Sequence, residues 1–441
     1  MRKVIVIAGT RPEAIKVVSV VHELRKFPES FEVLLCSTGQ HREMLTQTFA
    51  DFDMEPDIHL DVMAPNQTLS GLSARLFEKL DALLLEQKPH MLLVQGDTTS
   101  VQVASLAAFY RGIPVGHIEA GLRSHTIHSP FPEELNRRIT GLVAAWHFAP
   151  TPLSRQNLMD EGVAERDIAV TGNTVIDALL MMRDKVRQNP PALPDPLEQV
   201  LREQRRIILV TGHRRESFGN GLRQVCKGLA ALAGRFPENR IVYPVHPNPN
   251  VQGMVHDMLD RHPGIILCSP LGYKSFIRLM DAAYLIITDS GGIQEEAPSL
   301  GKPVLVTRDL TERPEGVEAG VNILVGANEA ALVREAVRLL DDEAAYNQVA
   351  GIRNPYGKWD RRAADCTLST GQGSIEMSMK NQFLRAIKYF RTYGFRRFVN
   401  RSMGFVQGHS WGISYLFGRD SMSLSVVSEV TSQPLSSCLL A

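Results

Sequence analysis

Residues 284–297, YLIITDSGGIQEEA, decide how this chain folds, because they place three kinds of segment in order. YLIIT is a short run rich in apolar and β-branched residues, as expected of a strand buried on both faces. DSGG has the composition of a tight turn, and IQEEA favours a helix. A buried strand that passes through a turn into a helix is half of a βαβ unit, and such units build parallel sheets.

The same rhythm recurs along most of the chain. Apolar runs occupy 3–9, 31–39, 90–97, 114–120, 146–151 and 168–173, and then 205–213, 240–246, 264–271, 284–290, 303–309 and 321–326. A helix is predicted over 70–87, another from the PFPEELNRR segment, and a long one over 328–349. The proline-rich stretch 188–199 breaks the rhythm and is typical of a linker. The fold class is therefore α/β, with two tandem doubly wound, Rossmann-like domains.

We divide the chain at that linker. Residues 1–187 are predicted to form a first Rossmann-like domain, 188–204 the linker and 205–357 a second Rossmann-like domain. Residues 358–441 lack the alternation, contain 11 Lys and Arg against 5 Asp and Glu, and end in a Ser-rich stretch. We expect this basic tail to be a poorly ordered extension, and the alternative is a helix that binds a membrane surface or a partner.

Composition disfavours several classes of protein. Lys and Arg balance Asp and Glu at 48 each, so no global basic field favours nucleic acid. The five cysteines are scattered without CxxC spacing, so neither a disulfide framework nor a zinc site is indicated. No apolar run reaches membrane-spanning length and no signal peptide is apparent, which predicts a cytoplasmic protein. A P-loop kinase or a dehydrogenase is disfavoured, since neither glycine fingerprint is present.

Polar residues gather where strands of the first domain end. Arg11 and Lys16 follow the first strand and flank the start of a helix, which is a favourable place for phosphate. Asp97 and Glu119 close two later apolar strands, and Glu133 opens a helix a few residues on. The carboxyl ends of parallel strands share one edge of a sheet. The three carboxylates therefore suit proton transfer at that edge.

The second domain has a matching set of strand ends. Ser290, Gly291 and Gly292 stand at a predicted helix start, where backbone N–H groups can approach an anion closely. Glu296 lies one turn into that helix and could accept ribose hydroxyls. His213 and Arg313 could add positive charge around a diphosphate. The pattern indicates phosphate binding in one domain and proton transfer in the other.

Simpler interpretations remain open for several of these residues. Asp97 could cap the helix that follows it. Glu133 and Glu134 could both be first-turn acids that complement the helix dipole, and for Glu134 this interpretation is favoured. His213 could be a core histidine, and Arg11 and Lys16 could lie on a solvated face.

The motifs in their order resemble those of the non-hydrolysing UDP-N-acetylglucosamine 2-epimerases over about residues 3–357. They are GTRPEAIK (9–16), QGDTTS (95–100), HIEAGLRS (117–124), SPFPEELNRR (129–138), TGHRRES (211–217), YPVHPNP (243–249), TDSGGIQEEAPSLGKPVLV (288–306) and TERPEGVEAG (311–320). The resemblance implies a GT-B-like arrangement with a cleft between the two domains. It also implies interconversion of UDP-N-acetylglucosamine and UDP-N-acetylmannosamine by elimination and re-addition of UDP, without a metal or redox cofactor. Members usually form homodimers and supply bacterial surface polysaccharides.

The resemblance also implies roles for individual residues of this chain. Asp97, Glu119 and Glu133 become acid/base candidates whose separate roles stay open, and His213 joins them in the site. The phosphates would be held by Arg11, Lys16, His213, Ser290, Gly291, Gly292 and Arg313, the ribose by Glu296, and uracil by residues 271–276, from Leu271 to Phe276.

The end of the chain departs from the family pattern. NPYG (354–357) is followed by KWDRRAADCTLSTGQGS rather than by the helix with which relatives close across the two domains. Weaker closure would favour a hydrolysing epimerase that releases N-acetylmannosamine and UDP, because closure keeps water from the intermediate. A non-catalytic sugar-nucleotide-binding protein is the third alternative, and the intact Asp97, Glu119, Glu133 and His213 argue against it.

Overall fold

The computed structural model describes residues 1–39, 42–64, 67–212 and 219–357, which belong to one compact unit. The predicted basic tail and His213 lie outside the described residues. Within the described ranges, no helix has both the length and the apolar character that a membrane span requires.

The first sheet is parallel throughout and has seven strands in the order β3-β2-β1-β4-β5-β6-β7. Its strands are β1 (Arg2–Ala8), β2 (Phe31–Ser37), β3 (Ile58–His59), β4 (Met91–Gln95), β5 (Val115–Ile118), β6 (Trp146–Ala149) and β7 (Ile168–Val170). The helices between and after them are α1 (Arg11–Arg25), α2 (Arg42–Asp51), α3 (Leu69–Gln87), α4 (Thr99–Tyr110), α5 (Glu133–Val143), α6 (Pro152–Asp160) and α7 (Thr174–Gln188).

The second sheet is also parallel and has six strands in the order β10-β9-β8-β11-β12-β13. Its strands are β8 (Ile207–Thr211), β9 (Arg240–Pro244), β10 (Ile265–Cys268), β11 (Leu285–Thr288), β12 (Val304–Val306) and β13 (Asn322–Leu324). Its helices are α9 (Asn220–Arg235), α10 (Pro249–Leu259), α11 (Tyr273–Ala282), α12 (Gly291–Glu296), α13 (Pro314–Glu318), α14 (Glu329–Asp341) and α15 (Glu343–Ala350), and α8 (Asp195–Arg202) precedes them.

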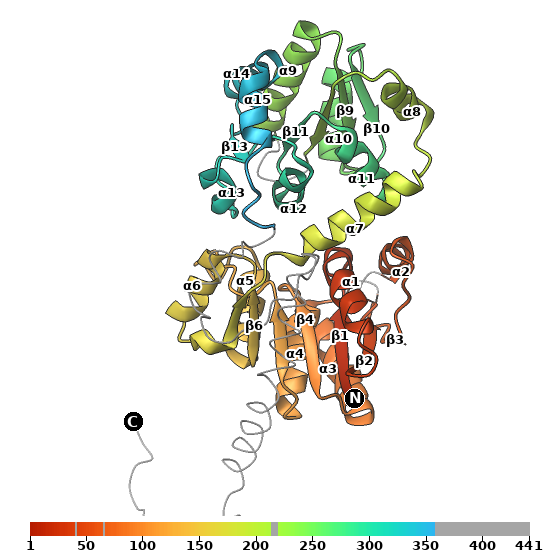
Figure 1. The fold of residues 1–441 in the computed structure, drawn as a ribbon, viewed down its shortest axis with the longest axis vertical. Coiled ribbons are helices and arrows are strands. Elements are labelled where there is room, and N and C mark those ends of the chain that lie inside the picture. Colours follow the sequence, from red (N-terminus) through yellow and green to blue (C-terminus); the bar gives the residue numbers. More distant parts are fainter. Residues whose placement is uncertain (40–41, 65–66, 213–218, 358–441) are drawn as a thin grey trace, which may run out of the picture. The chain divides into compact units, whose positions relative to one another are not determined.

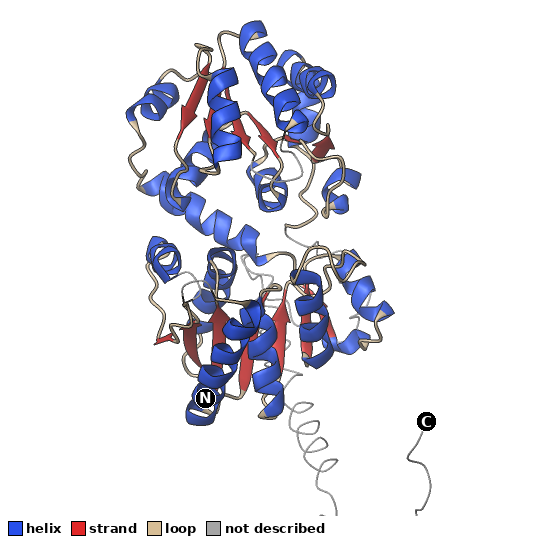
Figure 2. Cartoon of the chain, turned by 180° about the vertical axis from the view of Figure 1, so that it is seen from behind, coloured by secondary structure: helices blue, strands red, loops and turns tan. Residues whose placement is uncertain are grey.

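Helices lie in front of the strands in one view and again in the view from behind, so both faces of each sheet are covered (Figures 1 and 2). Central strands such as β4 are buried along their whole length. This explains why the strands are continuous apolar runs rather than alternating ones. Every predicted run contains a strand, and the α/β class with two parallel doubly wound sheets is confirmed.

Two helices differ from the sequence prediction. The helix predicted over 328–349 is two helices, because Asp342 is extended (φ −111°, ψ 102°) and its carboxylate accepts the Ala345 backbone N–H at 3.0 Å. The side chain thus caps a new helix at the point where the old one ends. The stretch predicted as linker contains α8, which buries Leu197 and Val200.

Candidate active site

The strand order of each sheet reverses at one point, between β1 and β4 in the first sheet and between β8 and β11 in the second. Ligands of open parallel sheets bind beyond the carboxyl ends of strands at such a reversal. Arg11 directly follows the turn after β1, Asp97 follows β4 and Ser290 follows β11. The topology thus puts these predicted residues at the two positions where a ligand is expected.

Glu119 leaves β5 in a backbone conformation that favours glycine, with φ +65°. Its side chain is buried and its carboxylate is fully hydrogen-bonded. Lys16 Nζ lies 2.7 and 2.6 Å from the two oxygens, Gln95 donates to Oε2, and Asn173 Nδ2 donates to Oε1 at 3.1 Å. Strained backbone of this kind persists where the surroundings fix it, and it clusters at functional sites.

Charge keeps Glu119 and Lys16 ionised as a pair. Burial opposes the charge on Glu119, but Lys16, Arg313 and the Asn173 amide outweigh it and hold the pKa of Glu119 below its ordinary value. Burial likewise opposes the charge on Lys16, and Glu119 and Glu295 raise the pKa of Lys16 above its ordinary value. Lys16, predicted to hold phosphate, is therefore engaged with a carboxylate in this structure.

Asp97 is held by α5 rather than by the helix that follows it. Arg137 donates to Asp97 Oδ2, and Asn136 Nδ2 donates to the Asp97 backbone carbonyl at 2.9 Å. The cap of α4 is Thr98, whose hydroxyl accepts the Val101 N–H. The capping role that the sequence left open for Asp97 is therefore wrong, and its carboxylate faces an arginine instead.

Glu134 is a buried anchor, so the prediction that it only complements the helix dipole is wrong. Its carboxylate accepts the Ser124 backbone N–H at 3.0 Å, Arg137 Nη1 at 3.3 Å and Arg138 Nε at 2.9 Å. A carboxylate this deeply buried needs such partners, whereas a simple first-turn acid stays in solvent. Glu134 thus ties the loop before α5 to the arginine that holds Asp97. Glu133 is half-buried at the first residue of α5.

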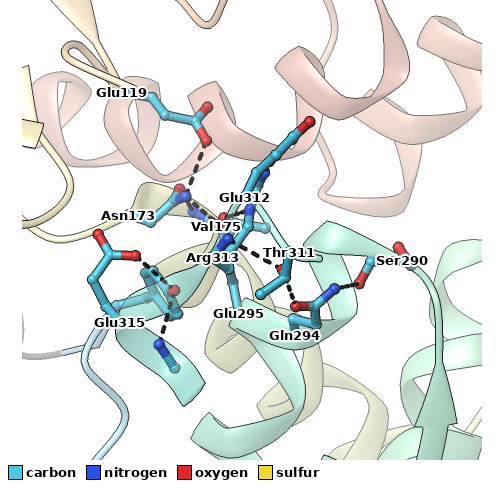
Figure 3. Close-up of polar contacts among 12 residues, drawn as sticks. Glu119, Asn173, Val175, Ser290, Gln294, Glu295, Thr311, Glu312, Arg313 and Glu315 are labelled. Carbon is cyan, nitrogen blue, oxygen red and sulfur yellow. Dashed lines mark hydrogen bonds and ion pairs between the residues drawn. The ribbon is translucent and has the colours of Figure 1, made fainter. Parts of the chain in front are cut away.

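The predicted phosphate turn at 290–292 lies against Arg313. A Cβ placed on Gly291 would come within 3.2 Å of Arg313 Cζ, so a larger residue here would require the Arg313 side chain to shift by a few tenths of an ångström. Arg313 Nε donates to Glu295 Oε1 at 2.8 Å, and its Nη1 donates to Glu312 Oε2 at 2.9 Å (Figure 3). Ser290 and Arg313 are thereby brought to one end of α12, as the sequence predicted for a phosphate site.

Glu296, predicted to hold ribose, ends α12 near the start of α11. Burial, and then the charge of Glu296, raise the pKa of Tyr273, which opens α11. Burial and the neighbouring Glu295 raise the pKa of Glu296 itself to about 8. Leu271 precedes α11 and Phe276 lies within it, and both are half-buried. The structure thus brings Glu296 to the segment predicted for uracil.

Asn173, which the sequence prediction left out, joins the two halves of the site. It follows β7 and is buried, and its Nδ2 donates to Glu119 Oε1 at 3.1 Å and to Glu295 Oε2 at 2.6 Å (Figure 3). Its Oδ1 accepts the Val175 N–H at 3.1 Å, which fixes the orientation of the amide. One amide group therefore bridges Glu119, which follows β5 of the first sheet, and Glu295, which lies in α12 after β11 of the second sheet.

Lys16, Glu119, Asn173, Glu295 and Arg313 form one continuous run of hydrogen bonds, which we call the Lys16–Arg313 network. It contains two cations and two carboxylates. Buried charges of this kind are tolerated only when paired and fully hydrogen-bonded, as these are. The network places two fixed positive groups beside Glu119, the carboxylate predicted as an acid/base candidate, and this combination suits phosphate binding together with proton transfer.

Other contributing residues were also absent from the sequence prediction. Gln95 ends β4 and donates to Glu119, and its place at a strand end was a usable signal. Glu13 caps α1 by accepting the N–H groups of residues 9 and 10, and burial raises its pKa to about 7. Its T-x-x-E spacing was a signal for the cap but not for the site. Arg137 lies in the SPFPEELNRR motif, but nothing in that motif indicates that its side chain contacts Asp97.

Comparisons with known proteins identify the family to which the chain is similar. A sequence model of the UDP-N-acetylglucosamine 2-epimerase family matches residues 22–365. A UDP-N-acetylglucosamine 2-epimerase of Yersinia pestis is 54% identical over 358 residues, which cover 80% of this chain and 95% of that one. Another from Escherichia coli K12 is 51% identical over 357 residues, with the same coverage of each chain.

Solved structures of UDP-GlcNAc 2-epimerases also resemble this chain. UDP-GlcNAc 2-epimerase of Neisseria meningitidis, solved bound to UDP-GlcNAc, superposes with a TM-score of 0.72 at 43% identity and covers 80% of this chain and 96% of its own. The Methanocaldococcus jannaschii UDP-GlcNAc 2-epimerase, solved in complex with UDP-GlcNAc and UDP, gives a TM-score of 0.67 at 32% identity and covers 81% and 96%.

Proposed function

The chain belongs to the UDP-N-acetylglucosamine 2-epimerase family, and on that premise we propose that it interconverts UDP-N-acetylglucosamine and UDP-N-acetylmannosamine without hydrolysing them. The observation that carries the proposal is the Lys16–Arg313 network, in which the acid/base candidate Glu119 is hydrogen-bonded to a predicted phosphate ligand. The Neisseria neighbour, solved bound to UDP-GlcNAc, supports the class of ligand.

The chemistry explains why acid/base groups and phosphate ligands must share a site. No carbonyl in the ring lies beside carbon 2, so its proton is not acidic enough for simple removal and return. In the proposed reaction a base takes that proton while the bond from carbon 1 to the diphosphate oxygen breaks, leaving a double bond between carbons 1 and 2. The diphosphate then adds back to carbon 1, and an acid delivers a proton to the opposite face of carbon 2.

This reaction returns every atom that it removes, so it consumes neither an oxidant nor water. UDP must stay bound through both steps, and fixed donors stabilise its charge without reorganising. We assign that task to Arg11, Lys16, Ser290, Gly291, Gly292 and Arg313, together with His213. The proton carriers are then sought among Asp97, Glu119 and Glu133.

Isotope exchange tests the reaction directly. UDP-N-acetylglucosamine incubated with the protein in deuterated water is expected to become a mixture of two UDP-linked epimers, each with deuterium at carbon 2, because the proton returned comes from a group in exchange with solvent. Proton NMR of the products measures both the label and the link to UDP.

Two results would contradict this proposal. Turnover to the manno epimer with no deuterium at carbon 2 would exclude the elimination. Release of free N-acetylmannosamine and UDP would instead establish the hydrolysing alternative.

We also propose that the product supplies bacterial surface polysaccharides. UDP linked to carbon 1 activates that carbon for glycosyl transfer, so a glycosyl-transfer reaction is the chemical fate that suits a UDP-linked sugar.

A homodimer is proposed through the face formed by α3, α4 and α5. Leu85, Phe109, Tyr110 and Leu142 are exposed near the carboxyl ends of these helices, and α4 packs against both of its neighbours. Apolar side chains gathered on one face mark protein interfaces more often than scattered ones do. Tyr110 is 72% and Leu142 86% exposed.

Charge on that face is expected to separate the dimer. The unchanged protein should have twice the chain mass of 49.0 kDa by light scattering, and a Tyr110→Glu, Leu142→Glu double variant should have the single mass. Leu153→Glu is the matched control, because Leu153 is exposed on α6, outside this face. An unchanged protein with the single mass, or a control that dissociates equally, would contradict the interface.

A further inference from the structure

The two cations predicted to hold the diphosphate already have carboxylate partners. Lys16 Nζ contacts both oxygens of Glu119, at 2.7 and 2.6 Å. Arg313 Nε donates to Glu295 at 2.8 Å. A diphosphate that binds these cations must therefore compete with two carboxylates for them.

Because both cations are already paired, binding of a diphosphate would change the charge balance of the two buried carboxylates. Glu119 is 7% and Glu295 2% exposed, so water does little to solvate either carboxylate. A nucleoside diphosphate adds roughly two to three negative charges. Burial already holds the pKa of Glu295 above its ordinary value, although Arg313 and Lys16 oppose this effect. If Lys16 and Arg313 turn to the phosphates, both carboxyl groups lose their positive partners, and burial then strongly disfavours their ionised forms.

We propose that a nucleoside diphosphate draws a proton from solvent into the Glu119–Asn173–Glu295 unit as it binds, so that the site acquires its ligand and its acid together. The step converts one carboxylate of the unit into a carboxylic acid, and the proton comes from bulk solvent. The inference rests on the proposed function, because it requires the diphosphate to bind at Lys16 and Arg313.

Asn173 is the reason for assigning the proton to the unit rather than to one residue. Its Nδ2 donates to both carboxylates, so the two titrate as one coupled system. The amide can only donate from this nitrogen and cannot itself take a proton. A proton that binds to either Glu119 or Glu295 therefore relieves the repulsion between the two carboxylates that the Asn173 amide joins.

The other titratable groups near the unit do not account for such an uptake. The groups that face the Glu119–Asn173–Glu295 unit come from five segments. They are Lys16 of α1, His117 of β5, Glu296 of α12, Arg313 in the loop before α13, and Tyr356 in the segment after α15. Burial lowers the pKa of His117 to about 3, so this imidazole stays neutral. Burial and then Glu315 raise the pKa of Tyr356, which stays protonated. Glu296, with a pKa of about 8, is already largely protonated near neutral pH.

The consequence for the reaction is that the acid exists only while UDP is bound. Before binding, burial opposes the charge on Glu119, but Lys16, which contacts both of its oxygens, helps to hold the pKa of Glu119 below its ordinary value. After binding, the unit holds a proton beside the sugar that can be delivered to carbon 2 when UDP adds back. Loss of UDP would return the proton to solvent and restore the ion pair between Lys16 and Glu119.

Calorimetry of UDP binding measures the proton count. Titrations near neutral pH in HEPES and in Tris buffer, which differ in ionisation enthalpy, should differ in apparent heat by an amount equal to uptake of about one proton per UDP. Glu119→Gln and Glu295→Gln each remove one site of the unit, so each should lower the uptake by about half or more.

Glu312→Gln is the matched control, since Glu312 also contacts Arg313, at 2.9 Å, but is exposed to water. Its uptake should equal that of the unchanged protein. An uptake that survives in both Glu119→Gln and Glu295→Gln belongs to another group, such as His213, and would overturn the inference.

A second measurement needs no variant. The infrared difference spectrum of the unchanged protein, UDP-bound minus free, should gain the carbonyl stretch of a protonated carboxyl group. UDP binding with neither this band nor a buffer-dependent heat would overturn the inference and leave the proposed function standing. Failure of the unchanged protein to bind UDP at all would overturn both.

Discussion

Replacing Glu119 by glutamine is expected to lower kcat by about 10²–10⁴-fold, the range over which positioned acid/base groups act, and to leave UDP affinity no weaker. The amide keeps the size of the carboxylate but cannot carry the proton. It also removes the charge that Lys16 contacts at 2.6 Å, so Lys16 becomes available to phosphate. Turnover is measured by NMR at saturating substrate, and UDP affinity by calorimetry.

A large loss of kcat without a loss of UDP affinity distinguishes an acid/base role of Glu119 from a structural one. Breaking a buried ion pair costs stability, about 3–5 kcal/mol in general, and a merely destabilised site would lose both properties. Glu23→Gln is the matched control, because Glu23 is buried on the same helix as Lys16 and pairs with Lys26. It should leave kcat unchanged. Equal loss of kcat and UDP affinity in Glu119→Gln would argue against the acid/base assignment.

The second large effect is expected from Gly121→Ala, two residues after Glu119. At Gly121 φ is +89°, and an added Cβ would meet the Ser154 carbonyl oxygen at 2.1 Å. Backbone strain costs about 1–3 kcal/mol and overpacking costs a similar amount. The variant should therefore be less stable by about 2–6 kcal/mol, measured as the free energy of unfolding in urea.

Gly112→Ala is the control for backbone strain alone. Gly112 also has a positive φ of +66°, but no atom lies within 4 Å of an added Cβ. Alanine there should cost only about 1–2 kcal/mol. If the two variants lose equal stability, the close approach of Gly121 to Ser154 does not constrain the chain. The folded fraction of Gly121→Ala should also lose turnover, because the turn that carries Glu119 must shift.

The fold could be predicted from the sequence because its signals are local. A run such as YLIIT has an apolar, β-branched composition that is independent of the rest of the chain, and the turn and helix signals beside it are also short-range. The prediction of one helix over 328–349 was wrong, because a single side chain interrupts the helical pattern. Asp342 lies inside a helical pattern, and its capping hydrogen bond ends one helix and starts the next.

The candidate site could be predicted only in part. Asp97, Glu119, Ser290 and Arg313 were predicted as site residues because they lie beyond the carboxyl ends of strands, where parallel sheets bind ligands. Asn173 and Arg137 were missed, because their importance comes from a partner rather than from their own position. Glu134 was placed wrongly for a related reason. Its residue type and position fit an exposed first-turn acid, and only packing shows that it is buried.

The sequence by itself determined the two parallel sheets, their approximate strands and the polar residues at the strand ends, since these depend on composition and spacing within a few residues. Only the tertiary structure decided which charges meet. Lys16 pairs with a carboxylate 103 positions away, and Asn173 reaches one 122 positions away. Such partnerships depend on strand order and on exclusion of water, which strengthens each charge interaction and makes an unpaired charge costly.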